Sequence, residues 1–301
     1  MFNKFIKPLV VILLALTLLS ACGRKTSGVE PPSAAELESQ PQAASSASSS
    51  SLSPLPPEPQ EVKFQSEDGQ ELVGWYYPAA INPAPLVVLM HWARGEKCDW
   101  EEIAYWLQNR GLSGSSTLLK TQPWLDPDWF PPMPEGKSYG TFAFTFRNCT
   151  CVEGYQTFDR KAWLQDALAA MRQARQLEGV DARRILAVGA SIGADGAVDA
   201  CQLINEEFPN TCQGAMPLSP GNYLTLNLAT VVNKLNEEEP PKPVWCVYPP
   251  GEGDCLKVQS IANVTTIECK HGEHGMLCLQ ESVEPDILSS LLELISITID
   301  T

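Results

Sequence analysis

The segment 183–195 constrains the fold of this chain more than any other, because an apolar strand-like run leads there into Gly-Ala-Ser-Ile-Gly. Residues 185–188 are apolar and β-prone, and residues 194–204 are small and compatible with a helix. In a strand–turn–helix setting, a Gly-x-Ser-x-Gly motif displays its serine on a sharp, strained turn that tolerates only small neighbours. We therefore predict that Ser191 is a displayed nucleophile and that the N–H of Ile192, at the helix start, faces a developing oxyanion.

The N-terminus has the pattern of a targeting segment. Two lysines precede an apolar run of 11 residues at 9–19, which is too short for a bilayer span of about 20 residues. The run ends in Leu-Ser-Ala-Cys at 19–22, which resembles a bacterial lipobox. That resemblance implies that residues 1–21 are a lipoprotein signal peptide and that Cys22 carries a diacylglyceryl thioether. An ordinary signal peptide or a short membrane anchor is the alternative.

Residues 22–60 combine the lipidated cysteine with a tether rich in Ser, Ala and Pro, which cannot bury a core and is expected to be disordered. The remaining segment, 61–301, has about 240 residues and is long enough for one sizeable α/β domain. We expect an extracytoplasmic protein that is lipid-anchored to the bacterial cell membrane.

The charge balance argues against one class of partner. The formal net charge of the chain is −15, so the basic footprint of a nucleic-acid-binding protein is absent. We expect a small-molecule or acylated substrate, no nucleic acid, and membrane contact through the lipid on Cys22. Acidity alone selects no substrate.

The cysteines suggest disulfide bonds. Of the ten cysteines, nine remain when Cys22 is set aside, and an exported domain favours their oxidation. The odd number leaves at least one thiol without a disulfide partner. Cys201 and Cys212 form the preferred local pair. A zinc site is the competing interpretation, but the cysteine and histidine spacings fit no standard finger or ribbon.

Strand and helix signals alternate along the domain. Strands are expected at 61–65, 71–77, 85–90, 141–146, 183–189, 214–218, 244–248 and 264–269. Helices are expected at 99–109, 159–177, 194–204 and 286–297. Two antiparallel strands followed by β–α alternation predict an α/β fold: a mostly parallel sheet of about eight strands with helices on both faces. The aperiodic segment 112–140 is either a functional cover or a surface excursion.

Several short motifs follow the expected strands at the edge where α/β active sites form. They are His-Trp-Ala-Arg-Gly at 91–95, Gly-Ala-Ser-Ile-Gly-Ala at 189–194, Leu-Ser-Pro-Gly at 218–221, Gly-Asp at 253–254 and His-Gly-Met-Leu at 274–277. On these residues the chain resembles the α/β-hydrolase superfamily over about 61–299, and within it the bacterial dienelactone-hydrolase-like and esterase-like members. The family order of serine, acid and histidine is met by Ser191, Asp254 and His274.

Chemistry supports the same three residues. A serine hydroxyl needs a base to remove its proton, and the base must be a histidine oriented by a carboxylate. His274 lies in a flexible Gly-Glu-His-Gly sequence that could reach Ser191, whereas its rival His271 lies nearer the strand end. Asp254 follows the seventh strand, where the family keeps its acid. Glu252 remains open as the alternative.

The resemblance also implies an oxyanion hole. Aligning His91-Trp92-Ala93 with the family's His-Gly-x sequence makes the N–H of Ala93 the second donor, beside that of Ile192. His91 itself would then have no catalytic role. Trp92 departs from the family pattern, because a small residue is often found there, and its ring could narrow the pocket.

These expectations combine into a secreted, lipid-anchored serine hydrolase, of the carboxylesterase type, that cleaves a carboxylic ester or related acyl bond through an acyl-enzyme. No metal and no organic cofactor is implied. A catalytically inactive binding protein that kept the hydrolase fold is the main alternative. A serine peptidase of the same fold is the third.

Overall fold

The computed structural model describes residues 55–93, 95–113, 125–150, 154–155 and 157–300. The expected signal peptide, Cys22 and most of the tether lie outside these residues. Among the helices of the described part, none has the length and apolar character needed to cross a membrane.

The described residues form an eight-stranded sheet with the order β1-β2-β4-β3-β7-β8-β9-β10. Its strands are β1 (Gln60–Gln65), β2 (Glu71–Tyr77), β3 (Ala84–Met90), β4 (Gly140–Thr145), β7 (Val180–Ala190), β8 (Cys212–Leu218), β9 (Val244–Tyr248) and β10 (Val264–Glu268). β2 pairs antiparallel with β1 and β4, and the other pairs are parallel. The predicted mostly parallel sheet is confirmed. A separate two-stranded ribbon joins β5 (Cys149–Thr150) to β6 (Gly154–Tyr155).

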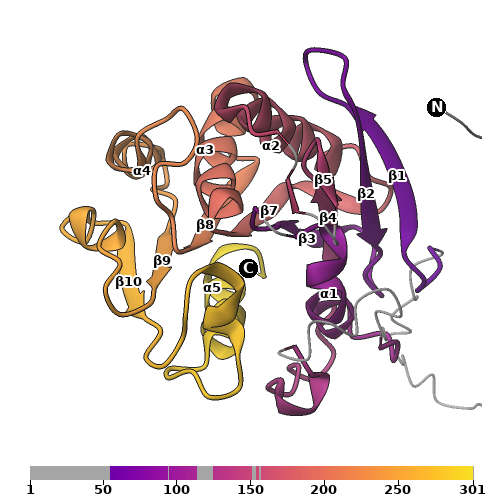
Figure 1. Cartoon of the computed structure of the whole chain (residues 1–301). Coiled ribbons are helices and arrows are strands. Elements are labelled where there is room, and N and C mark those ends of the chain that lie inside the picture. The colour runs from indigo at the N-terminus through magenta and orange to yellow at the C-terminus, as the bar shows by residue number, and fades with distance from the viewer. Residues whose placement is uncertain (1–54, 94, 114–124, 151–153, 156, 301) are drawn as a thin grey trace, which may run out of the picture. The chain divides into compact units, whose positions relative to one another are not determined.

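Helices cover both faces of the sheet (Figure 1). They are α1 (Glu101–Gln108), α2 (Arg160–Ala174), α3 (Ile192–Glu207), α4 (Leu228–Asn236) and α5 (Ile287–Thr298), with short 3-10 helices at Lys97–Trp100, Pro127–Trp129, Cys255–Lys257 and Gly275–Leu279. In Figure 1, α2, α3 and α4 lie above the sheet, and α1 and α5 lie below it. Burial on both faces explains why the central strands are continuously apolar.

The sheet separates two hydrophobic cores. In β3 every residue is buried, and successive side chains alternate between the cores: Val88 packs with α2 and α3, whereas Val87 and Leu89 pack with α1 and α5. This alternation is the two-residue period of a strand. Because helices cover both faces, a site is expected at the carboxyl ends of the parallel strands, which the helices leave accessible.

Two helices differ from the sequence expectation. The helix expected at 99–109 is a 3-10 turn followed by α1, and it ends where Asn109 adopts a left-handed φ of 48°, two residues before Gly111. The helix α4 was not predicted. Its signals are an Asn227 side chain that accepts the N–H of Thr230 and apolar residues at helical spacing.

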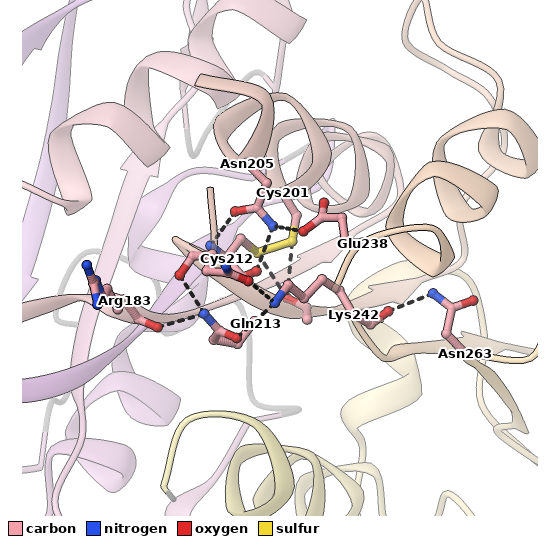
Figure 2. The surroundings of a disulfide bond; sticks show 10 residues. Arg183, Cys201, Asn205, Cys212, Gln213, Glu238, Lys242 and Asn263 are labelled. Atoms are coloured by element: carbon pink, nitrogen blue, oxygen red, sulfur yellow. Dashed lines mark hydrogen bonds between the residues drawn. A yellow bond between two sulfur atoms is a disulfide. The ribbon is translucent and has the colours of Figure 1, made fainter. Parts of the chain in front are cut away.

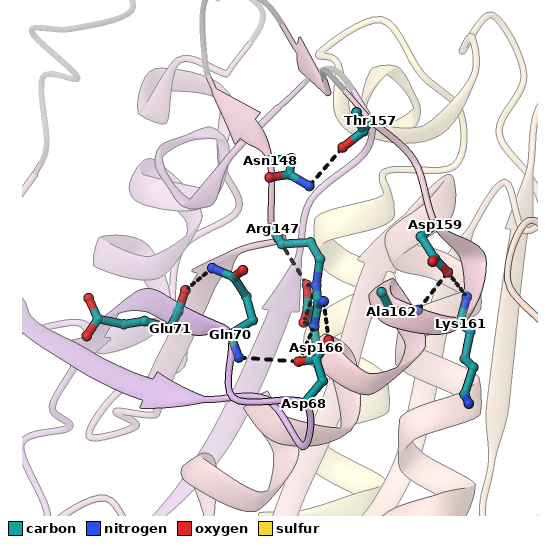
Figure 3. A network of polar contacts seen from close by, with 10 residues as sticks. All are labelled: Asp68, Gln70, Glu71, Arg147, Asn148, Thr157, Asp159, Lys161, Ala162 and Asp166. Carbon is teal, nitrogen blue, oxygen red and sulfur yellow. Dashed lines mark hydrogen bonds and ion pairs between the residues drawn. The ribbon is translucent and has the colours of Figure 1, made fainter.

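Arg147, just after β4, links that strand to two other parts of the fold (Figure 3). Its side chain donates to the buried carboxylate of Asp166 on α2 and to Asp68 in the β1–β2 turn. The backbone N–H of Arg147 also donates to Asp166 over 3.0 Å. The guanidinium holds the pKa of Asp68 down to about 2. This bridge fixes the end of β4 against α2 and the β1–β2 hairpin.

The structure contains three disulfide bonds among its described residues: Cys201–Cys212, Cys246–Cys255 and Cys269–Cys278. The expected pair Cys201–Cys212 joins α3 to the start of β8 (Figure 2). Beside it, the Asn205 amide accepts the N–H of Cys212 and donates to its carbonyl. The disulfide therefore lies in a polar network that ties a helix to the adjacent strand.

Candidate active site

Ser191 lies at the sharp turn between β7 and α3, as the motif predicted. Its φ of 54° is left-handed, and its residue is 8% exposed. A Cβ on Gly189 would overlap the carbonyl of Gly193, and a Cβ on Gly193 would overlap the carbonyl oxygens of Met90 and His91. Both glycines are therefore required by close backbone approach, which holds the serine at the end of the sheet in a strained conformation.

His274 connects Ser191 to a carboxylate. Its Nε2 lies 2.7 Å from Ser191 Oγ, and its Nδ1 lies 2.6 Å from Glu252 Oε1. With the proton on Nδ1, the ring donates to Glu252 and accepts the serine O–H. These contacts form the serine–histidine–carboxylate arrangement that activates a serine.

The acid in contact with His274 is Glu252, and the expectation that Asp254 takes this position is corrected. Asp254 Oδ1 accepts a hydrogen bond from Asn222 Nδ2 over 3.2 Å and pairs with Lys257 Nζ over 2.7 Å. The reason is the turn after β9: Glu252 N–H donates to Pro249 O over 3.2 Å, and Gly251 has a φ of +92°. This turn directs Glu252 toward His274, while Asp254 precedes the 3-10 helix that carries Lys257.

The two histidines of the following loop lie in different surroundings. His271 is exposed just after β10, with a φ of 66°. His274 is held over the elbow because the N–H of Gly275 donates to the buried Ser219 Oγ over 2.9 Å. Ser219 was not identified from the sequence as a site residue, although its motif after β8 was noted. Around these residues, and across the described part of the chain, no three His, Cys, Asp or Glu side chains group as metal ligands.

Gly275 allows this loop to approach the serine closely. Its φ is +66°, and a Cβ there would lie 3.4 Å from the Trp92 ring and 3.5 Å from Ser191 Cβ. Gly275 thus lies close to both the Trp92 ring and Ser191. The left-handed φ is what favours glycine at this position.

The expected oxyanion donors lie on two neighbouring segments. Ile192 is the first residue of α3, so its N–H is one of the amides that a helix leaves without an intrahelical acceptor. Ala93 is half-buried in the loop after β3, and the start of that loop packs on the elbow at Gly193. This packing brings the two segments together.

His91 has a structural environment. It is fully buried, its Nδ1 lies 2.6 Å from Trp92 O, and its Nε2 accepts the N–H of Phe146 over 3.0 Å. Burial lowers the pKa of His91 to about 4, so the ring is neutral and donates from Nδ1. His91 thus fixes the backbone beside Ala93.

Two buried aspartates, neither identified from the sequence, accept hydrogen bonds from Trp92 and from the loop of Tyr223, two aromatic residues near the serine–histidine–carboxylate arrangement. Asp99 Oδ2 accepts the indole N–H of Trp92 over 2.9 Å. Asp195, one turn after Ser191, accepts the backbone N–H groups of the loop that contains Tyr223. The Tyr223 ring lies 6.2 Å from that of His274, edge to face. Burial raises the pKa of Asp99 to about 7 and that of Asp195 to about 6.

No family model and no curated protein matches this chain. Solved structures do. The esterase Pf2001 of Pyrococcus furiosus superposes with a TM-score of 0.53 at 16% identity, over 80% of this chain and 93% of that protein. The esterase of Pyrobaculum calidifontis gives 0.54 at 12%, over 80% and 86%.

A third similar structure is the α/β hydrolase GrgF from a Penicillium species, with a TM-score of 0.56 at 14% identity over 81% of this chain and 100% of that protein. At such identities the similarity concerns the fold alone. The strand order, the serine turn after β7 and these superpositions lead to one conclusion. The chain described here has the α/β-hydrolase fold.

Proposed function

We propose that the protein is a serine hydrolase that cleaves a carboxylic ester, or a related acyl bond, through an acyl-enzyme. The observation that carries the proposal is the continuous relay from Ser191 Oγ through His274 to Glu252, with contacts of 2.7 and 2.6 Å. Such a relay supplies the general base that a serine hydroxyl needs at neutral pH.

In the first half of the reaction, Ser191 Oγ attacks the carbonyl carbon of the substrate while its proton passes to His274 Nε2. Glu252 accepts a hydrogen bond from His274 Nδ1–H and stabilises the imidazolium that forms. The carbonyl oxygen becomes an oxyanion, for which the N–H groups of Ile192 and Ala93 are the proposed donors. The positive end of α3 at Ile192 favours the same negative charge.

The tetrahedral intermediate then collapses, and His274 donates its proton to the departing alcohol. The acyl group remains on Ser191 Oγ. A water molecule next loses a proton to His274 Nε2 and attacks the acyl carbon. The bond between that carbon and Ser191 Oγ then breaks, His274 returns the proton to Oγ, and the carboxylic acid is released. No external redox partner or cofactor is required for these steps.

The solved structures of similar fold favour an ester as the substrate class. The similar structures from Pyrococcus and Pyrobaculum are esterases. We also propose that the mature protein is extracytoplasmic and anchored by lipid on Cys22, because its N-terminus resembles a lipobox.

The test is reaction of the purified domain with a fluorophosphonate probe and with short-chain aryl esters, with Ser191→Ala as the control. The proposal expects the wild type to be labelled and to hydrolyse the ester, and the control to do neither. An unlabelled, inactive wild type would instead favour a binding protein that kept the fold. Cleavage of peptides in preference to esters would make the protein a peptidase.

A further inference from the structure

We propose that the disulfides Cys246–Cys255 and Cys269–Cys278 are positioning elements for catalysis, because each closes a short loop that carries one member of the relay. Glu252 lies between the first two cysteines and His274 between the second two, and both pairs are separated by nine positions. This inference rests on the proposed hydrolase function. It adds that the cysteines act through the acid and the base.

The loop that carries Glu252 leaves the sheet at the end of β9 and ends at the 3-10 helix Cys255–Lys257. Cys246 is buried inside β9, and Cys255 is the buried first residue of that 3-10 helix. Between them the side chain of Glu252 is 32% exposed, so water competes for its carboxylate. The disulfide anchors both ends of the loop to the core, which limits the positions open to Glu252.

The loop that carries His274 is closed in the same way, by Cys269–Cys278. Cys269 follows β10, and its N–H donates to Tyr248 O at the end of β9 over 2.9 Å. Cys278 is buried in the 3-10 helix Gly275–Leu279 that follows His274. The two closed loops therefore leave neighbouring strands at one edge of the sheet, where the side chain of His274 is 38% exposed.

Catalysis makes a geometric demand that stability does not. His274 must keep contact with Ser191 and Glu252 at once, and a misplacement of about 1 Å can reduce turnover by about 10²-fold. A loop with half-exposed catalytic side chains gains alternative positions when its closure is removed. Opening either disulfide should therefore lower kcat more than it changes KM.

The third disulfide provides a matched control. Cys201–Cys212 has a separation of 11, close to the other two, so its effect on the entropy of the unfolded chain is similar. It joins α3 to the first residue of β8 (Figure 2). Ser219, which contacts the loop of His274, follows the other end of that strand. Its loss should affect stability without moving the relay.

The experiment compares three double variants, each with one cysteine pair replaced by alanine, using thermal unfolding and the kinetics of aryl-ester hydrolysis. We expect similar decreases in Tm for all three. We expect kcat to fall at least tenfold, with KM within twofold of wild type, when the 246–255 or 269–278 pair is removed. The Cys201→Ala/Cys212→Ala variant should keep the wild-type kcat. Should an alanine pair fail to fold, Cys246→Val with Cys255→Ala preserves more of the apolar volume.

A double-mutant cycle separates positioning from general damage. In a Glu252→Gln background, removal of the 246–255 disulfide should lower kcat less than twofold further, because the residue through which it acts is already disabled. The inference would be overturned if all three cysteine-pair variants kept the kcat of an active wild type. It would also be overturned if Glu252→Gln and loss of the 246–255 disulfide lowered kcat independently, so that their fold-changes multiplied. An inactive, unlabelled wild type would overturn the proposed function, and this inference with it.

Discussion

His274 Nδ1 and Glu252 Oε1 lie 2.6 Å apart, which makes Glu252 the carboxylate that orients the histidine. Asp254, only two positions along the same loop, pairs with Lys257 instead. The two acidic residues have different partners because the turn at Pro249–Glu252 points the Glu252 side chain toward His274 and the Asp254 side chain toward Lys257. The assignment of the acid therefore depends on the course of one short loop.

The first prediction tests that assignment. Glu252→Gln should lower kcat by about 10²–10⁴-fold, because the amide no longer stabilises the imidazolium or fixes the productive tautomer. Asp254→Asn should lower it less than about threefold, since that carboxylate does not contact His274. Aryl-ester kinetics on the two variants provide the measurement. The reverse ranking would restore Asp254 as the acid.

The second prediction concerns the nucleophile and the base. Ser191→Ala and His274→Ala should each reduce turnover by several orders of magnitude, because the relay acts as a unit. His271→Ala should have little effect, since that side chain is exposed at the strand end. Circular dichroism of each variant controls for folding. A dead His271→Ala beside an active His274→Ala would show that the base was assigned wrongly.

The third prediction uses two glycines with left-handed backbone. Gly275→Ala should destabilise the fold by about 1 kcal/mol because of its φ of +66°, and it should also lower kcat, because backbone adjustment there moves the adjacent His274. Gly69→Ala has comparable strain at a φ of +85°, but its methyl group meets no atom within 4 Å. It should lose stability alone. Equal activity in the two variants would contradict the role of Gly275.

The fourth prediction is a pH dependence of stability. Burial raises the pKa of Asp99 to about 7, with the Glu96 charge adding to the increase, so the folded protein keeps a proton that the unfolded chain loses near pH 4. This contribution is fully present below pH 4 and is lost as the pH rises through 7. The free energy of unfolding of the wild type should therefore fall relative to Asp99→Asn, by about 4 kcal/mol over the whole range and by about 3 kcal/mol between pH 5 and pH 8.

Urea unfolding of both proteins at pH 5 and pH 8 measures this difference. The variant retains an acceptor for the Trp92 indole but cannot ionise, so comparison of the two proteins isolates the carboxyl group. A difference in unfolding free energy that is the same at both pH values would show that Asp99 does not titrate in this range.

The fifth prediction concerns the anchor. A diacylglyceryl group on the sulfur of Cys22 would supply two acyl chains, which are enough for stable membrane attachment. The full-length protein should therefore partition into the detergent phase. Cys22→Ser should partition into the aqueous phase. Expression in a bacterium with lipoprotein processing, followed by detergent phase separation, provides the measurement. The same fractionation for both proteins would rule out the lipoprotein interpretation.

The sheet and the serine turn could be derived from sequence because their signals are local. The strands 71–77 and 244–248 coincide with the predicted ranges, since apolar runs bounded by turn residues encode buried strands directly. Ser191 was identified for the same kind of reason: its small neighbours are needed wherever a helix and a strand meet so closely. The sequence also holds the cap at Asn227, but α4 has only nine residues, and so short an amphipathic pattern is a weak signal.

The tertiary structure decided the identity of the residues that meet across loops. Glu252 and Asp254 both follow the same strand and both satisfy the family order, so only the direction of the turn distinguishes them. Likewise, the spacing of the cysteines around Glu252 and His274 is visible in the sequence, but their pairing depends on which Cβ atoms the fold brings together. Sequence specifies local conformation through short-range sterics, whereas a contact between loops follows from the packing of the whole sheet edge.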